Sequence, residues 1–109
     1  MVDFIVMPAA ERFIKKIKKS DKALFQKYRE AIDKICEDPT IGEMKHCDLE
    51  GYYGYDINHN KTSYELSYII GKNKSGQLVI VIMAGTRENF YEELKNYIKQ
   101  NKTVINNFK

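Results

Sequence analysis

The chain has 109 residues, of which 43% are hydrophobic and 30% are charged. That length suits one domain, residues 1–109, with a single core, and the composition is too apolar for a disordered chain. The net charge of +3 is too small for a protein that binds nucleic acid by charge alone. No apolar stretch approaches the ~20 residues of a membrane span, and the first residues lack the apolar core of a secretion signal. We therefore expect a cytoplasmic protein with no membrane partner.

The N-terminal third predicts a strand followed by a helical hairpin. Residues 2–7 form a short β-type run, and Pro8 suits the first position of the helix that follows. Asp21 can cap a second helix, in which apolar residues recur at helical spacing as far as residue 35. The apolar faces of two such helices need a flat partner, and a sheet is the natural candidate.

A cluster of lysines marks the junction between these two helices. Its members are Lys15, Lys16, Lys18, Lys19 and Lys22. They can steer the protein toward a polyanion, or they can form the solvated face of an amphipathic helix, which is the commoner case. The pattern alone leaves both interpretations open.

Beyond residue 44 the pattern changes to that of strands. Residues 45–49 can form one strand, and residues 55–58 and 63–70 are typical of two antiparallel strands. The polar turn at residues 59–62 joins the last two. The spacing therefore predicts an antiparallel sheet in this half of the chain.

Burial of the strands is predicted from their polarity. Tyr64 and Leu66 alternate with Glu65 and Ser67, so one face of that strand should be buried and the other wet. Residues 78–84 are apolar throughout, which is typical of a strand buried on both faces inside a sheet.

The C-terminal part predicts one helix. Asn89, with Glu92 three residues later, resembles a capping box for a helix whose apolar stripe runs through residues 90–98. The tail from residue 100 is rich in Asn and Lys, so we expect it to fray.

Two side chains at the end of the apolar strand are the first candidate site residues. Arg87 and Tyr91 follow the strand directly and should lie at a concave sheet edge that faces solvent. A guanidinium can grip a phosphate, and a phenol can stack on a nucleotide or protonate it. The alternative is that Arg87 caps or pairs on a helix while Tyr91 belongs partly to the core.

The sequence gives little support for a metal or another cofactor. The two histidines, His46 and His59, lie in different segments, and Cys36 and Cys47 lack the spacing of metal ligands. We therefore expect neither a metal site nor a cofactor.

Three segments carry a resemblance to a known family. They are Leu-Glu-Gly-Tyr at residues 49–52, YELSYI at residues 64–69 and GTRENFYEELKNY at residues 85–97. Together with the order of the elements, they resemble the RelE/ParE superfamily of bacterial toxins, and more narrowly its RelE/StbE branch. The similarity covers residues 2–99, and the last segment is its most specific part.

The resemblance implies both a fold and a function. The fold would be α+β: a curved antiparallel β-sheet with an N-terminal strand, a two-helix hairpin packed on one face and a C-terminal helix, with the helices on one side. The function would be that of the toxin of a type II toxin–antitoxin system. Such a toxin enters the ribosome and cleaves mRNA, and a cognate antitoxin neutralises it.

The implied cleavage needs no metal, because the ribose 2′-OH attacks the adjacent phosphate within the same strand. By resemblance, Arg87 would stabilise the charge of the transition state and Tyr91 would stack or orient the nucleotide. The chain departs from the family where basic residues are usual, because it has Asp56, Asn58 and Glu65 there. An acid near the scissile phosphate repels it.

Other residues can take over the missing roles. Lys45 and Lys61 are candidates for binding RNA, while His59 and Glu43 are candidates for proton transfer. His59 in a polar turn can equally be an ordinary turn residue.

Three functions remain open at the level of sequence. A ribosome-associated endonuclease is the preferred prediction. A toxin that binds without cutting, as ParE-like gyrase inhibitors do, is favoured by the missing basic residues. A remnant that retains only antitoxin and operator-complex binding is the third. Asp56 and Glu65 can also pair with Arg87 in the free protein, which would be a structural role and not a functional one.

Overall fold

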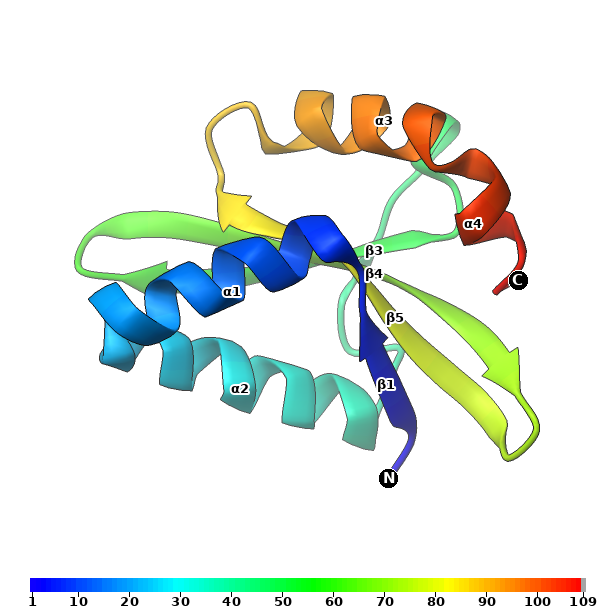
Figure 1. Cartoon of the computed structure of the whole chain (residues 1–109), viewed down its shortest axis with the longest axis horizontal. Coiled ribbons are helices and arrows are strands. Elements are labelled where there is room, and N and C mark those ends of the chain that lie inside the picture. The colour runs from blue at the N-terminus through cyan, green and yellow to red at the C-terminus, as the bar shows by residue number, and fades with distance from the viewer. Residues whose placement is uncertain (109) are drawn as a thin grey trace.

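A computed structural model describes residues 1–108, which form one five-stranded sheet with helices on both faces (Figure 1). The strands are β1 (Asp3–Val6), β2 (Glu43–Met44), β3 (Tyr52–His59), β4 (Thr62–Asn73) and β5 (Gly76–Thr86). The helices are α1 (Pro8–Ser20), α2 (Lys22–Glu37), α3 (Phe90–Gln100) and α4 (Lys102–Asn106), with a 3₁₀ turn at Cys47–Leu49. No helix in the described part of the chain has the length and apolarity needed to cross a membrane.

The strand order is β1-β5-β4-β3-β2, and the predicted α+β fold is confirmed. Strands β2 to β5 pair in antiparallel fashion, as predicted, while β1 pairs in parallel with β5 from Asp3↔Leu78 to Val6↔Val81. A parallel pair needs a long crossover connection, and here most of the chain lies between the two strands. Strand β5 lies between β1 and β4, which explains its unbroken apolar run.

The predicted helical hairpin covers one face of the sheet. Helix α1 begins at Pro8, and the side chain of Asp21 caps α2 by accepting the backbone N–H of Leu24 at 3.1 Å. The core on this face combines helix residues with every second residue of the central strands. Its largest members are Leu24, Tyr28, Ile35, Leu66, Tyr68, Val79 and Val81.

Helices α3 and α4 cover the opposite face, whereas the resemblance implied helices on one side only (Figure 1). Their core residues are Phe90, Leu94 and Ile105, and the sheet contributes Ile69, Ile80 and Ile82. The reason is the composition of β5, because a strand that is apolar on both faces must be covered on both.

The tail from residue 100 was expected to fray, and the structure instead gives it a short helix with a buried anchor. Ile105 on α4 is 1% exposed, and Phe108 packs against the same core. The Phe108 carbonyl also accepts the backbone N–H of Lys72 at 3.3 Å. Two apolar residues among polar neighbours therefore hold this segment against the sheet.

The strand expected at residues 45–49 is wrong. Strand β2 has only two residues, Glu43–Met44, after which a 3₁₀ turn spans Cys47–Leu49. Cys47 has a φ of 57°, in the left-handed region, which is incompatible with an extended strand.

The expected capping box at Asn89 is also wrong. Asn89 has a φ of 58° and makes no side-chain hydrogen bond to the start of α3. The left-handed conformation, which Asn tolerates, turns its side chain away from the helix, and the Arg87 carbonyl accepts the Phe90 N–H at 3.1 Å instead.

The prediction that one face of β4 is exposed to solvent is wrong for Glu65 and Ser67. Glu65 is 1% exposed and Ser67 is fully buried. The face that carries them is covered by α3, whose packing could not be foreseen from the alternation within one strand. A carboxyl group is therefore buried beneath the C-terminal helix.

The anchoring of the tail can be tested with two neighbouring residues. Ile105→Ala should reduce the free energy of unfolding by about 2–5 kcal/mol, because it removes a fully buried side chain. Val104→Ala is the matched control and should change it by less than about 0.5 kcal/mol, because Val104 is 48% exposed. Urea unfolding measures both values. Equal effects of the two substitutions would mean that α4 is not anchored.

Candidate functional site

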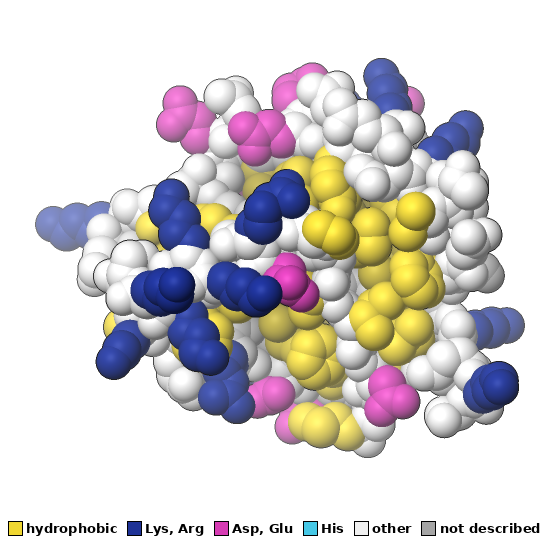
Figure 2. All heavy atoms as spheres, in the orientation of Figure 1, with side chains coloured by type: hydrophobic (Ala, Val, Ile, Leu, Met, Phe, Trp, Pro, Cys, Tyr) yellow, Lys and Arg dark blue, Asp and Glu magenta, His cyan; other side chains and the backbone are white. Residues whose placement is uncertain are grey.

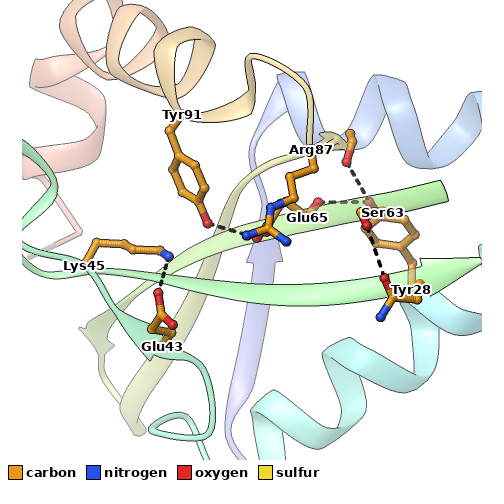
Figure 3. A network of polar contacts seen from close by, with 9 residues as sticks. Tyr28, Glu43, Lys45, Ser63, Glu65, Arg87 and Tyr91 are labelled. Carbon is orange, nitrogen blue, oxygen red and sulfur yellow. Dashed lines mark hydrogen bonds and ion pairs between the residues drawn. The ribbon is translucent and has the colours of Figure 1, made fainter.

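A small hollow lies beside α3, where β2, β3 and the end of β5 meet (Figure 3). Its lining residues are Ile41, Gly42, Glu43, Lys45, Gly54, Tyr55, Asp56 and Arg87. The volume of about 240 Å³ is below the ~300 Å³ at which pockets for whole small molecules begin. The hollow is therefore suited to one phosphate group or part of a nucleotide.

Glu65 is the buried carboxyl group next to this hollow. Its Oε2 accepts the hydroxyl of Tyr91 at 2.9 Å, and its Oε1 lies 3.6 Å from Nε of Arg87. Burial raises the pKa of Glu65 to about 7, and the adjacent Asp56 carboxyl contributes to the rise, while Tyr91 and Arg87 oppose it. A carboxyl with this pKa can take up or release a proton at neutral pH.

Arg87 is the exposed cation of the site. Its backbone N–H donates to the carbonyl of Ser63 at 2.9 Å, which fixes the start of the turn after β5. The side chain is 61% exposed and lines the hollow, and its only ion pair among residues 1–108 is with Glu65. The sequence-based alternative of pairing with Glu65 is therefore confirmed, while most of the guanidinium stays open to a ligand.

Tyr91 extends from α3 toward the sheet, as Figure 3 shows. Burial, followed by the hydrogen bond to Glu65, raises the pKa of Tyr91 to about 12, so the phenol stays protonated and acts as a donor. Lys45 places its ammonium 4.7 Å from the centre of the Tyr91 ring. Gly54 makes room for both, because a Cβ there would lie 2.6 Å from the Tyr91 hydroxyl oxygen.

Glu43 and Lys45 form an ion pair at the entrance of the hollow (Figure 3). Lys45 holds the pKa of Glu43 below its ordinary value, first through the hydrogen bond and then through its charge. Burial alone would lower the pKa of Lys45, but the contacts with Glu43 and Tyr91 outweigh it and raise that pKa. Glu43 therefore stays ionised near neutrality, which disfavours it for proton transfer.

The structure does not bring His59 to this site. His59 shares the face of β3 that carries Ile57, under α2, and its Nε2 lies 3.1 Å from Oδ2 of Asp21. Its Nδ1 is buried without a hydrogen-bond partner among residues 1–108. Glu65 lies opposite Asp56, on the other face of the sheet. His59 therefore ties the β3–β4 hairpin to the helices.

Lys61 lies at the exposed tip of the same hairpin. Asn60 and Lys61 both adopt left-handed conformations, with φ of 47° and 66°, as a tight two-residue turn between strands requires. Lys61 is thus displayed to solvent beyond the hollow and is not among its lining residues.

Two residues of the candidate site were missed or given a different role in the sequence analysis. Glu65 was expected on the wet face of its strand, and because Ser63 and Ser67 share that face, the strand's own sequence gives no signal of burial. Tyr28 was assigned to the helix stripe, but its hydroxyl also donates to the carbonyl of Glu65 at 2.9 Å. Burial raises the pKa of Tyr28, so this phenol remains a donor and holds β4 in place.

The site has more carboxyl groups than cations. Glu43, Asp56 and Glu65 face Lys45 and Arg87, so the group is neutral only when one carboxyl holds a proton. Among residues 1–108, no cluster of three or more His, Cys, Asp or Glu is arranged to hold a metal ion.

The fold and the hollow together define a small toxin of the RelE/ParE type, as the resemblance in the sequence indicated. The family model described as the ParE-like toxin of type II bacterial toxin–antitoxin systems matches residues 5–95, and the chain belongs to this family. Membership implies a cognate antitoxin as a partner.

Two solved structures are similar to this chain in fold. One is a YoeB/ParE toxin from Agrobacterium tumefaciens, with 17% identity and a TM-score of 0.64, covering 79% of this chain and 99% of that one. The other is a double arginine-to-alanine mutant of the E. coli toxin RelE in the free state, with 15% identity and a TM-score of 0.66, covering 92% and 96%. A comparison with curated protein sequences gave no significant match. At these identities, the similarity shows the fold alone.

The buried carboxyl should make stability depend on pH. Because the pKa of Glu65 is raised from 4.5 to about 7 by folding, the bound proton stabilises the protein below pH 4.5, and this stabilisation is lost as the pH rises to about 7. Glu65→Gln removes this contribution, so the free energy of unfolding of the variant relative to the parent should rise by up to about 3 kcal/mol from pH 4.5 to pH 8.

Urea unfolding at both pH values measures this change. Glu92→Gln on the exposed side of α3 is the control, and its difference from the parent should stay constant with pH. A Glu65→Gln variant whose stability runs parallel to that of the parent would show that Glu65 titrates normally.

Proposed function

We propose that this toxin is a metal-independent endoribonuclease that cleaves mRNA on the ribosome in the cytoplasm and is neutralised by a cognate antitoxin. The observation that carries the proposal is the buried Glu65 carboxyl, with a pKa of about 7, between the Tyr91 phenol and the Arg87 guanidinium. A proton acceptor and a positive charge at one place are the two requirements of the reaction.

The first step is the transfer of a proton from the ribose 2′-OH to Glu65. The 2′-oxygen then attacks the adjacent phosphorus and the bond to the 5′-oxygen breaks, which leaves a 2′,3′-cyclic phosphate. The departing 5′-oxygen takes a proton from solvent water and leaves as a 5′-hydroxyl. Tyr91 donates a hydrogen bond to Glu65 and thereby orients the carboxylate, as an orienting group does for a catalytic base.

Arg87 has two successive partners in this scheme. In the free protein it contacts Glu65, and its exposed guanidinium must turn toward the phosphate when RNA enters the hollow. The departure of Arg87 uncovers Glu65 and removes a positive charge that opposed its raised pKa, so the carboxylate becomes a stronger base as the substrate binds.

The two lysines support binding in different places. Lys45 lines the hollow and supplies a second positive charge near the phosphate. Lys61, at the tip of the hairpin, can contact a flanking phosphate. His59 and Glu43, the other candidates from the sequence, have no part in this scheme, because one faces the helices and the other is held ionised by Lys45.

A toxin that binds without cutting, as ParE-like gyrase inhibitors do, is the second candidate. One observation favours it: three carboxyl groups face two cations around the hollow, which weakens its attraction for a phosphate. A degenerate remnant that binds only its antitoxin is compatible with the same observation. The two substitutions below separate cleavage from these alternatives.

Removal of the Arg87 charge tests the nuclease directly. Arg87→Ala should reduce cleavage by roughly 100- to 1,000-fold and relieve growth inhibition, because a developing charge loses a preorganised partner. Arg87→Lys should rescue only part of the rate, since it keeps the charge but loses the two-pronged geometry. Inducible expression in a bacterium, with mapping of mRNA 5′ ends, measures both.

Lys72→Ala, on an exposed part of the distant β4–β5 hairpin, is the control for loss of a single charge. If Arg87→Ala inhibits growth as strongly as the parent and the mRNA ends do not change, the nuclease proposal is wrong and the binding toxin takes its place.

Removal of the Glu65 proton acceptor is the second test. Glu65→Gln preserves the shape and the hydrogen bond from Tyr91 but should lower the cleavage rate by at least about 100-fold. The kcat/KM of the parent, which reports the free protein, should rise with pH and level off near the pKa of about 7, and this rise should be absent in the variant. A pH–rate profile of the variant that keeps the same rise would assign the base to another group.

A further inference from the structure

A strongly basic surface lies at the junction of α1 and α2, outside the candidate site. Residues 12–29 contain eight Lys or Arg and one Asp, a net charge of +7 in a chain whose total is +3. The rest of the chain therefore carries −4. All eight cations are exposed, and we call them the basic corner: Arg12, Lys15, Lys16, Lys18, Lys19, Lys22, Lys27 and Arg29.

Figure 2 shows Lys and Arg side chains gathered on the side of the molecule where α1 lies. Within residues 1–108, the only ion pair of the basic corner joins Lys15 to Glu11, at 3.1 Å. The single acid of the segment, Asp21, is already engaged, because it caps α2 and contacts His59. The positive charge of the corner is therefore largely uncompensated.

The surface lacks the apolar side chains that membranes and protein partners use. The large exposed hydrophobic residues in the described part of the chain are Met1, Phe4, Ile5, Ile41, Met44 and Val104, all outside residues 12–29. Membrane-binding helices insert an exposed apolar face, and protein interfaces rely on apolar anchors at their centre. Phosphate backbones, by contrast, can be bound by Lys and Arg side chains without apolar anchors.

A chain of contacts connects the basic corner to the candidate site. Nζ of Lys27 donates to the carbonyl of Asn58 at 2.8 Å, and the side chain of Asn58 accepts the hydroxyl of Ser63 at 3.3 Å. The carbonyl of Ser63 accepts the backbone N–H of Arg87 at 2.9 Å. The end of the β3–β4 hairpin thus spans from the corner to the hollow, with Lys61 at its tip.

We propose that the basic corner binds the phosphate backbone of a nucleic-acid duplex without recognising its sequence, and holds it next to the hollow. Binding of a duplex at the basic corner does not require nuclease activity. Only the next step rests on the proposed function: the single strand that continues from the duplex would reach Arg87 and be cleaved there. An RNA duplex and a DNA duplex present the same phosphate chemistry, so the experiment includes both.

The test measures the affinity of the full chain for a 20-base-pair duplex by fluorescence anisotropy at several salt concentrations. The variant Lys16→Gln/Lys18→Gln/Lys19→Gln/Lys22→Gln should bind roughly 100-fold more weakly at about 0.1 M salt. The slope of log K against log salt should fall in magnitude by about 3 to 4, because each lost phosphate contact contributes about 0.9. Two unrelated sequences should give equal affinities.

The matched control removes four lysines elsewhere: Lys72→Gln/Lys74→Gln/Lys99→Gln/Lys102→Gln. These four lysines are exposed as well, and their replacement changes the net charge by the same amount. If binding depends on the basic corner, the affinity of this control should fall by less than about threefold. Circular dichroism confirms that both variants fold. Equal losses in the two variants would overturn the proposal, since binding would then follow net charge alone.

Further arms separate the possible ligands from one another and from catalysis. If the RNA duplex binds more tightly than the DNA duplex, the natural ligand is RNA; if the DNA duplex binds more tightly, the ligand is DNA. Tighter binding of phosphatidylglycerol vesicles or of polyglutamate than of either duplex overturns the proposal. Arg87→Ala should lose cleavage yet bind the duplex within about threefold of the parent. If the parent protein binds the duplex through the basic corner but does not cleave RNA, the proposed nuclease activity is refuted and the proposed binding surface is not.

Discussion

The burial of one carboxyl group on β4 is the constraint on which the rest of the site depends. Glu65 is 1% exposed because α3 closes over that face of the sheet, and an isolated buried carboxylate is costly. The protein compensates with the Tyr91 hydroxyl, with the Arg87 guanidinium and with a raised pKa that lets the group hold a proton. Each compensating group is also one that RNA cleavage would use, so structure and proposed chemistry share the same contacts.

The two-faced sheet divides the molecule into parts with different tasks. The face under α1 and α2 is a closed apolar core, in which even His59 is buried and paired with Asp21. The face under α3 is apolar at one end and polar at the other, and the hollow opens at the polar end. The helices that build the closed core display their cations outward, so the most basic surface and the candidate hollow are built on the same sheet.

Most of the fold was predictable because periodicity and turn residues act locally. Pro8 and Asp21 marked the helix starts, and the apolar run of residues 78–84 marked an interior strand. The errors at Glu65 and at the tail share one cause, which is tertiary contact, whereas those at Cys47 and Asn89 arise from left-handed backbone conformations. The polar–apolar alternation of β4 predicts that Glu65 is exposed, but a helix that begins 25 residues later in the chain buries it. The tail is held by two apolar side chains, whose contacts cannot be predicted from its polar composition. The sequence placed Arg87 and Tyr91 together at the end of β5 because a recognisable turn carries them, but it did not place the buried Glu65 carboxyl between them.

Gly54 has a genetic consequence. A methyl group there would meet side chains and not backbone: the Tyr91 hydroxyl at 2.6 Å, Cε of Lys45 at 2.9 Å and Oε2 of Glu65 at 3.5 Å, so the strand could keep its course while the hollow lost its shape. Because the Tyr91 hydroxyl would have to move away from Glu65, alleles with Ala at this position would disturb the candidate site, and under the proposed function they would lose toxicity. In a cell that carries both alleles, such a protein would occupy antitoxin without doing harm, and so leave more of the active toxin free. A loss-of-function allele of this kind would behave as a dominant enhancer of the intact one.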